Sequence, residues 1–283
     1  MAFMALNELG GKAAAITGAA SGLGRAMALA FAAEGMHLAL ADVDEAGLEE
    51  TRALLGSPDS KIVSMRVDVS KAEDVNRFAE RAAVELNGVH LVCNNAGVAV
   101  SGPVWETSEA EWQWILGVNL LGVVNGVRAF VPRLIAQDEG HIVNTASVAG
   151  LISPPGMGAY CVSKHAVVTL SEALHHDLRE RGSRVGVSVL CPAYVPTRIA
   201  DSERHSPAEV ITKSRERLAK EAALRKAVAA GKLSADDVAR AVVAAVKENR
   251  FYVLTHPGIK GAVRARMEDV LEERAPRDPL RLK

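Results

Sequence analysis

The chain has 283 residues, 49% of them hydrophobic, and its formal net charge is -1 at pH 7. This length suits one large domain or two small ones, and the near-zero charge argues against a nucleic-acid partner or an acidic substrate. The three cysteines form no Cys-x-x-Cys pair, so we expect reduced, buried thiols and a cytoplasmic location. The start lacks a basic segment followed by a long apolar one, which predicts no signal peptide. No apolar run reaches roughly 18 residues, and residues 26–41 come nearest, so we expect no membrane association.

A glycine-rich turn follows the first predicted strand. Residues 12–17 form a short apolar run, and a helix is expected to reach about Glu34. Between them stands Thr17-Gly18-Ala19-Ala20-Ser21-Gly22-Leu23-Gly24. Glycines let the backbone approach a pyrophosphate, and a helix N-terminus offers N–H groups and partial positive charge. The spacing is Gly-x-x-x-Gly-x-Gly rather than the common Gly-x-Gly-x-x-Gly, so a plain tight turn remains the alternative.

An acidic residue ends the second predicted strand. Residues 37–41 are an apolar run that stops at Asp42, about 20 positions past the glycines, where a carboxylate can accept hydrogen bonds from ribose hydroxyls. The alternative, that Asp42 caps the helix expected at 45–55, suits Asp44 better. Asp42 would repel a 2′-phosphate, Ser21 is not basic, and no Arg or Lys lies between Gly35 and Thr51. The sequence therefore favours NAD over NADP.

Strands and helices continue to alternate along the chain. We expect further strands at 62–67, 90–93, 142–146, 185–190 and 251–254, and helices at 70–86, 108–137, 158–181 and 234–249, with a final amphipathic helix reaching 274. Ser70 with Glu73, and Ser108 with Glu111, match capping boxes. This alternation predicts an α/β fold, one domain with a doubly wound parallel sheet of about seven strands.

Three segments depart from this regular pattern. Asn119 lies within the apolar part of the helix at 108–137, where a buried amide needs partners, so it is either a structural bridge or a site residue. Residues 198–231 are charged and helix-prone, especially 209–230, and are expected to form a mobile lid over a substrate pocket, with a solvated helical excursion as the alternative. The tail at 275–283 is expected to be loose. The eight histidines form no metal-binding pattern, so no metal is predicted.

The stretch from Ser147 to Lys164 carries groups that can act together. Tyr160 and Lys164 are four residues apart and share one face of a helix. An ammonium beside a phenol favours the phenolate, which predicts a lowered pKa and a general acid or base at Tyr160. Ser147 follows a buried strand, at the end where open α/β sheets bind ligands. A surface Tyr and a surface Lys on one helix remain the alternative.

Taken together, these motifs resemble those of the compact short-chain dehydrogenases/reductases, over residues 10–255. Each motif alone is only moderately informative, whereas all of them in this order are specific. The resemblance rests on Thr17-Gly18-x-x-x-Gly22-x-Gly24, Asp42, Asp68-Val69, Asn94-Asn95-Ala96-Gly97, Asn119, Ser147, Tyr160-x-x-x-Lys164 and Pro192-x-x-Val195-x-Thr197. The long insertion at 198–231 and a helix after the seventh strand depart from the minimal family pattern.

The resemblance implies a catalytic tetrad. Tyr160 would exchange the proton with the alcohol oxygen, and Lys164 would lower its pKa and hold the nicotinamide ribose. Ser147 would hydrogen-bond the substrate oxygen, and Asn119 would hold a water in a proton relay. The residues expected to contact NAD are Gly18, Ser21, Gly22, Leu23, Gly24, Asp42, Val43, Asp68, Val69, Asn95, Ala96, Gly97, Tyr160, Lys164, Pro192, Val195 and Thr197.

The sequence thus predicts an NAD-dependent oxidoreductase acting on a secondary alcohol or its ketone. Apolar pocket candidates suggest a hydrophobic or ring-containing substrate: Val98, Val100, Leu151, Ile152, Met157, Tyr194 and Ile199. One alternative is an NADPH-dependent 3-oxoacyl-carrier-protein-type reductase, against which Ser21 and Asp42 argue. Another is an NAD-binding regulatory protein without catalysis, against which the complete tetrad argues. Helices 108–137 and 158–181 usually pair between subunits in the family, so a homodimer or tetramer is expected.

Overall fold

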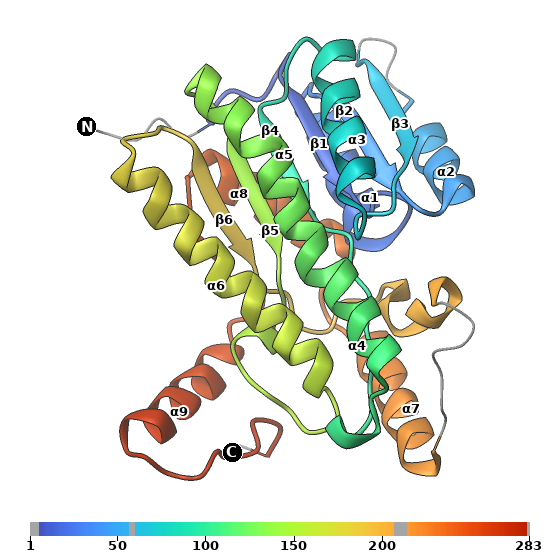
Figure 1. The fold of residues 1–283 in the computed structure, drawn as a ribbon, viewed down its shortest axis with the longest axis vertical. Coiled ribbons are helices and arrows are strands. Elements are labelled where there is room, and N and C mark those ends of the chain that lie inside the picture. Colours follow the sequence, from blue (N-terminus) through green and yellow to red (C-terminus); the bar gives the residue numbers. More distant parts are fainter. Residues whose placement is uncertain (1–5, 57–59, 207–213, 282–283) are drawn as a thin grey trace.

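The computed structural model describes residues 6–56, 60–206 and 214–281. Seven strands form one parallel sheet in the order β3-β2-β1-β4-β5-β6-β7 (Figure 1). The predicted α/β fold, a single doubly wound parallel sheet, is confirmed. The strands are β1 (Ala13–Thr17), β2 (His37–Asp42), β3 (Ile62–Arg66), β4 (Leu91–Asn94), β5 (His141–Thr145), β6 (Gly186–Leu190) and β7 (Tyr252–Val253).

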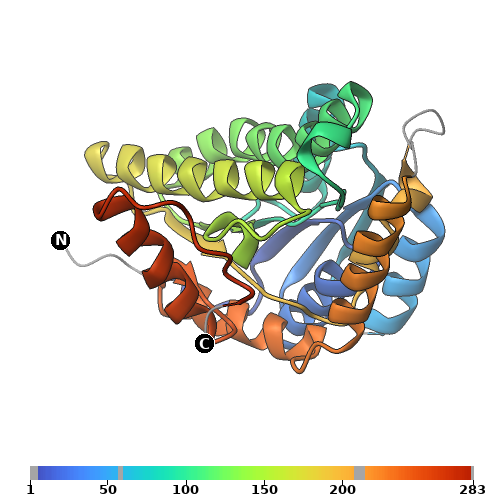
Figure 2. The same ribbon diagram turned by 90° about the horizontal axis from the view of Figure 1, so that it is seen from below.

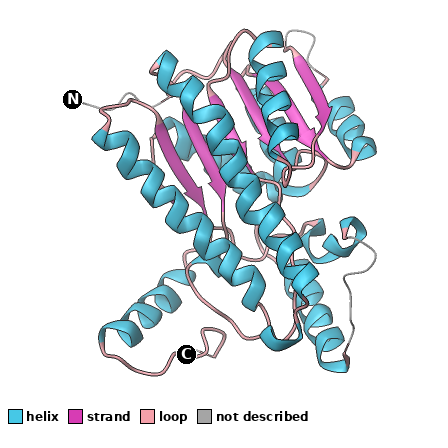
Figure 3. Cartoon of the chain, viewed as in Figure 1, coloured by secondary structure: helices cyan, strands magenta, loops and turns pink. Residues whose placement is uncertain are grey.

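Helices cover both faces of the sheet, as Figures 2 and 3 show. The helices α1, α2 and α8 contribute to one core cluster, and α3, α5 and α6 contribute to the other. The nine α-helices of the described residues are α1 (Gly22–Ala33), α2 (Glu45–Leu55), α3 (Ala72–Glu85), α4 (Glu109–Leu116), α5 (Gly122–Gln137), α6 (Gly158–Glu180), α7 (Arg215–Ala229), α8 (Ala235–Lys247) and α9 (Ile259–Leu271).

The central strand β1 is apolar over its first four residues because both of its faces are buried. Every residue of β1 is buried. Ala14 and Ile16 enter the core beneath α1 and α8, whereas Ala13 and Ala15 enter the core beneath α3 and α5. This alternation follows from the two-residue period of a strand. The apolar run that predicted β1 therefore supplies both cores at once.

The helix predicted at 108–137 is continuous but not uniform. The segment α4 begins with the expected capping box between Ser108 and Glu111. A π-helical turn, η2 (Gly117–Leu121), then joins α4 to α5. By length and composition the combined helix could cross a membrane, but half of its apolar window is buried inside the protein, as in a core helix of a soluble protein. The combined helix is thus closer in length and composition to a membrane-spanning helix than residues 26–41, which the sequence analysis named as the nearest candidate.

Two local predictions are wrong. Ser70 does not cap α3: the helix begins at Ala72, and the Ser70 hydroxyl donates to the Asp68 carboxylate at 2.6 Å. The same Asp68 oxygen also accepts from the Ser70 N–H at 3.1 Å, so Asp68 fixes Ser70 in the turn before the helix. Residues 275–281 are not loose, because the Asp269 carboxylate binds Arg277. Residues 282–283 lie outside the described part of the chain.

The segment predicted as a lid contains two helical pieces in its described part. They are the 3-10 segment η4 (Arg198–His205) and α7. Residues 207–213 of the predicted lid lie outside the description. Figure 1 shows η4 and α7 below the sheet, on the side of α4 and away from α9.

Candidate active site

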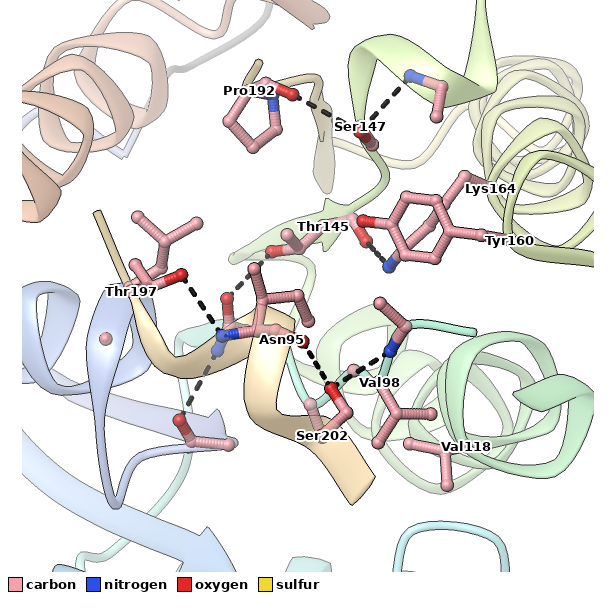
Figure 4. Close-up of a pocket in the computed structure, with 18 of the residues that line it drawn as sticks. Asn95, Val98, Val118, Thr145, Ser147, Tyr160, Lys164, Pro192, Thr197 and Ser202 are labelled. Atoms are coloured by element: carbon pink, nitrogen blue, oxygen red, sulfur yellow. Dashed lines mark hydrogen bonds between the residues drawn. The ribbon is translucent and has the colours of Figure 1, made fainter. Parts of the chain in front are cut away.

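A cavity of about 1040 Å³ opens at the carboxyl ends of the strands. The strand order reverses between β1 and β4, and this is the point where open α/β sheets bind ligands. The turns after β1, β2, β4, β5 and β6 all contribute to its lining, and η4, α7 and α9 close it from below. Figure 4 shows a close-up of this region.

The glycine-rich turn is built for close approach of backbone. Gly18 and Gly22 have φ angles of 69° and 53°, a region that L side chains rarely adopt. A Cβ atom on Gly24 would lie 2.0 Å from the carbonyl oxygen of Gly18. Ser21 is the N-cap residue of α1 and, among the described residues, its side chain makes no capping hydrogen bond. The N–H groups of the first turn can therefore receive an anionic group from the cavity.

Asp42 braces this turn and faces the cavity. Its carboxylate accepts from the N–H of Ala20 at 3.0 Å and from the N–H of Asp44 at 3.1 Å. Asp44, not Asp42, caps α2 by accepting from the N–H of Gly47 at 3.0 Å. The interpretation that left Asp42 available for a ribose thus agrees with the geometry.

Sequence analysis missed two basic residues on this side of the cavity. Arg204 and His205, at the end of η4, line it together with Asp42 and Asp44. Burial lowers the pKa of Arg204, and the carboxylates of Asp42 and Asp44 oppose that shift. The Ser202 hydroxyl accepts from the N–H of Ala99 at 3.0 Å and so ties η4 to the loop after β4. No sequence motif indicates that Arg204 lies near Asp42, because about 160 residues separate them.

Ser147, Tyr160 and Lys164 come together from the end of β5 and the first turns of α6 (Figure 4). The Ser147 hydroxyl donates to the carbonyl oxygen of Pro192 at 3.3 Å and accepts from the N–H of Ala149 at 3.1 Å. The Lys164 ammonium donates to the carbonyl oxygen of Thr145 at 2.9 Å and lies 5.8 Å from the centroid of the Tyr160 ring. The alternative of two surface residues is excluded for Lys164, which is 3% exposed.

The pKa values of this group differ from the prediction. Burial raises the pKa of Tyr160 to about 12, and the hydrogen bond from Ser147 opposes that rise. Burial also lowers the pKa of Lys164 to about 8. A lowered pKa of Tyr160 in the protein alone is therefore wrong: desolvation of the phenolate outweighs its stabilising contacts. Tyr160 is a neutral phenol that can donate a proton, and extra positive charge in the cavity would favour its phenolate.

Asn119 is a structural bridge. Its amide oxygen accepts from the N–H of Val98 at 2.8 Å, and its amide nitrogen donates to the Val98 carbonyl and to the Ser163 hydroxyl. A Cβ atom on Gly97 would lie 3.4 Å from both the Asn119 amide oxygen and the Lys164 nitrogen, so this bridge lies directly behind the lysine. The hydrogen bonds of Asn119 agree with the predicted structural bridge, and its place behind Lys164 is also compatible with a site residue.

The cavity gathers most of the predicted residues. The predicted site residues that line it are Gly18, Ser21, Gly22, Leu23, Asp42, Val43, Asp68, Val69, Asn95, Ala96, Gly97, Ser147, Tyr160, Lys164, Pro192, Val195 and Thr197. Gly24 and Asn119 lie behind that lining. Among the pocket candidates, Val98, Ile152, Met157, Tyr194 and Ile199 line the cavity, but Val100 and Leu151 do not, because they pack in apolar clusters beside it. Sequence analysis missed Trp114, Leu224, Val228, Ile259, Pro279 and Leu280.

Comparison with known proteins identifies the family. Residues 12–208 match the short chain dehydrogenase family. The chain belongs to this family. Its members are oxidoreductases, and the fold and the arrangement of the tyrosine and lysine agree with that assignment.

Individual relatives cover nearly the whole chain. A short-chain dehydrogenase/reductase from Burkholderia phymatum, solved in complex with NAD, is 50% identical, with a TM-score of 0.94 over 97% of this chain and 99% of that one. A CLA biosynthesis dehydrogenase/reductase from Lactiplantibacillus plantarum is 33% identical, with 92% and 93% covered. The 1-deoxy-11-beta-hydroxypentalenate dehydrogenase of Streptomyces exfoliatus is 34% identical, with 92% and 88% covered. The prediction of NAD agrees with the Burkholderia complex.

Proposed function

We propose that this protein transfers a hydride between NAD(H) and a hydrophobic secondary alcohol or its ketone. The observation that carries the proposal is the group of Ser147, Tyr160 and Lys164, which lines one continuous cavity with the glycine-rich turn. Ser147 and Lys164 are buried, and Tyr160 is partly buried. This is the arrangement needed to hold a dinucleotide at one end and a reacting oxygen at the other.

The residues present fit NAD. The first turn of α1 can receive the pyrophosphate, and Asp42 can accept hydrogen bonds from the adenosine ribose. Asp42 with Asp44 would repel a 2′-phosphate, which favours NAD over NADP and argues against the NADPH-dependent acyl-carrier reductase. The bound cofactor supplies or takes the hydride. Val195 and Thr197 would hold its nicotinamide end, and Lys164 the adjoining ribose.

Residues of the chain itself would transfer the proton. Tyr160 donates it to the carbonyl oxygen during reduction and accepts it from the alcohol during oxidation. Ser147 donates a hydrogen bond to the substrate oxygen as negative charge develops there. Lys164 stabilises the Tyr160 phenolate by its charge, and Asn119 holds the loop at Val98 that backs the lysine. The presence of all four groups argues against a regulatory protein without catalysis.

The substrate end of the cavity is largely apolar. Val98, Ile152 and Met157 line it from the segments that follow β4 and β5, and Ile199, Leu224 and Val228 line it from the predicted lid. Removing such surfaces from water favours an apolar substrate by about 25 cal/mol per Å² of buried surface. We propose a hydrophobic or ring-containing alcohol on this basis.

We also propose a homodimer formed through η2, α5 and α6. Leu121 and Val162 are about half exposed on these helices, and Trp105 nearby in the sequence is 82% exposed. Such side chains are favourable to bury between subunits. Light scattering coupled to gel filtration would measure the mass, and a monomer at micromolar concentration would contradict the proposal.

Absorbance of the reduced nicotinamide tests the reaction. Wild-type protein with NAD or NADP is offered secondary alcohols from 2-butanol to 1-(2-naphthyl)ethanol. We expect turnover with NAD on the bulky members, and a loss of at least a hundredfold in kcat for Tyr160→Phe. Tyr252→Phe is the matched control, because Tyr252 donates its hydroxyl to Glu172 on the outside of the molecule. Full activity of Tyr160→Phe would refute the mechanism, and turnover with NADP alone would refute the cofactor assignment.

A further inference from the structure

The chain after α9 is fixed in place by a buried carboxylate. Asp269 is 4% exposed, and its two carboxylate oxygens accept from the backbone N–H of Arg277 at 3.0 Å and from its Nε at 2.8 Å. Arg277 also donates to the carbonyl oxygen of Ala265 at 2.8 Å. We call these contacts among Asp269, Arg277 and Ala265 the tail clasp. Because a buried carboxylate is costly without its partners, the clasp holds the tail against α9.

The clasp directs the end of the chain to the cavity. The Asp278 carboxylate accepts from the N–H of Leu280 at 3.0 Å, which turns the chain just after the clasp. Pro279 and Leu280 then line the same cavity as Tyr160. Figure 2, which views the carboxyl ends of the strands, shows this segment turning back from α9 across them. Leu280 is 61% exposed, so its side chain is available to contact a molecule bound in the cavity.

The start of α9 connects this segment to the catalytic end. The N–H of Ala193, just after β6, donates to the His256 side chain at 3.2 Å. Ile259 and Ala262, in the first turns of α9, line the cavity with Tyr194. Tyr194 lies close enough to Tyr160 for its charge to act on the pKa of that residue, although burial is the main influence. The tail, the start of α9, Tyr194 and Tyr160 therefore line one and the same cavity.

The tail stands opposite the predicted lid. Leu224 and Val228 of α7 line the cavity from the side of α4, whereas Pro279 and Leu280 line it from the side of α9. We propose that residues 275–281 are the second wall of the substrate compartment and that Leu280 limits the size of the alcohol or ketone that reaches Tyr160. This inference rests on the proposed alcohol and ketone chemistry, and it assigns the choice of substrate size to the tail.

Quenching of bound NADH fluorescence by acrylamide tests the wall without turnover. A wall over the substrate compartment shields the reduced nicotinamide from the quencher. Relative to wild type, we expect the Stern–Volmer constant to rise at least twofold in Arg277→Ala, which opens the clasp, and in a chain ending at Arg274. Arg281→Ala is the matched control, because the Arg281 side chain is 87% exposed and pairs with Asp278, a neighbour within the tail. An unchanged constant in both altered chains overturns the proposal.

Substrate profiles test the assignment to Leu280. Leu280→Ala should raise kcat/KM for 1-(2-naphthyl)ethanol relative to 2-butanol at least threefold, and Leu280→Trp should lower that ratio by a similar factor. The Kd for NADH should stay unchanged in both variants. If the ratio is unchanged in both, Leu280 does not select by size. If the wild type binds NADH but oxidises no alcohol, the proposed function fails, and quenching alone then decides whether the wall exists.

Discussion

A buried ion pair is predicted to hold α7, the helix that covers the substrate end of the cavity. The Arg217 guanidinium binds the Glu111 carboxylate of α4, and the two side chains are 4% and 1% exposed. Arg217 also pairs with Glu221 at 3.1 Å. Burial lowers the pKa of Arg217, but its bonds to the two carboxylates reverse that shift and leave the pKa raised. Removing either Arg217 or Glu111 should loosen α7, and the two substitutions should do so to different extents.

The magnitude depends on what each substitution leaves behind. Arg217→Met leaves Glu111 buried with only the N–H and hydroxyl of Ser108 as donors, so we expect the full cost of a broken buried pair, about 3–5 kcal/mol. Glu111→Gln leaves Arg217 paired with Glu221, and the cost should be about 1–2 kcal/mol. The double variant Glu111→Met with Arg217→Met leaves no buried charge unpaired. It should cost about 1 kcal/mol, mainly for the lost capping box.

Hydrogen exchange followed by mass spectrometry is the suitable assay, because the cost should appear as local opening of α7 rather than as global unfolding. Amides of α7 should exchange at least about a hundredfold faster in Arg217→Met, since about 1.4 kcal/mol corresponds to a factor of ten. Amides of α1 should be unchanged. If Glu111→Gln opened α7 as much as Arg217→Met, or if the double variant were the worst of the three, the reasoning from unpaired charge would be refuted.

Three further predictions follow from single sites. Burial lowers the pKa of His141 from 6.5 to about 3, so its contribution to stability is present above pH 6.5 and is lost as pH falls, by about 1.4 kcal/mol per pH unit. In chemical denaturation between pH 4 and 7, the free energy of unfolding of His141→Gln should therefore fall less steeply with decreasing pH than that of wild type. The control His176→Gln, at an exposed histidine, should fall as steeply as wild type. Gly24→Ala should abolish NADH binding or folding, because its Cβ would meet the Gly18 carbonyl; a normal Kd by fluorescence titration would contradict this. Arg204→Gln should raise the Kd for NADH up to about fivefold at low salt and less at high salt, and salt-independent affinity would argue against a charge effect.

Local signals in the sequence predicted much of the fold and of the site. Apolar runs predicted the seven strands, since parallel strands that are buried on both faces are rich in apolar residues. Asp44, Ser108 and Ser234 cap the helices expected from them, because a cap requires only a few adjacent residues. The glycine turn, Ser147, Tyr160 and Lys164 each end or begin such an element. Topology then brings them to one edge of the sheet.

Contacts between distant segments could not be predicted in this way. Nothing near Arg277 in the sequence indicates that it binds Asp269 or that Leu280 reaches the cavity. The pairing of Arg217 with Glu111 crosses 106 positions. At Ser70 the pattern of a capping box was present, but Asp68 competed for the same hydroxyl. A pattern gives the residues able to form a contact, whereas the contact formed depends on which partner the tertiary fold brings within reach.

The pKa of Tyr160 illustrates the same limit and bears on the mechanism. Four residues of helix place Lys164 near the phenol, but the fold also buries both, and burial opposes charge on each. In the protein alone, a neutral phenol with a pKa of about 12 is a proton donor suited to ketone reduction. For the proposed oxidation Tyr160 would have to act as the phenolate, and positive charge in the cavity, such as a bound oxidised cofactor would supply, would favour that form. We therefore propose that the protonation state of Tyr160 depends on the other charges in the cavity as well as on Lys164.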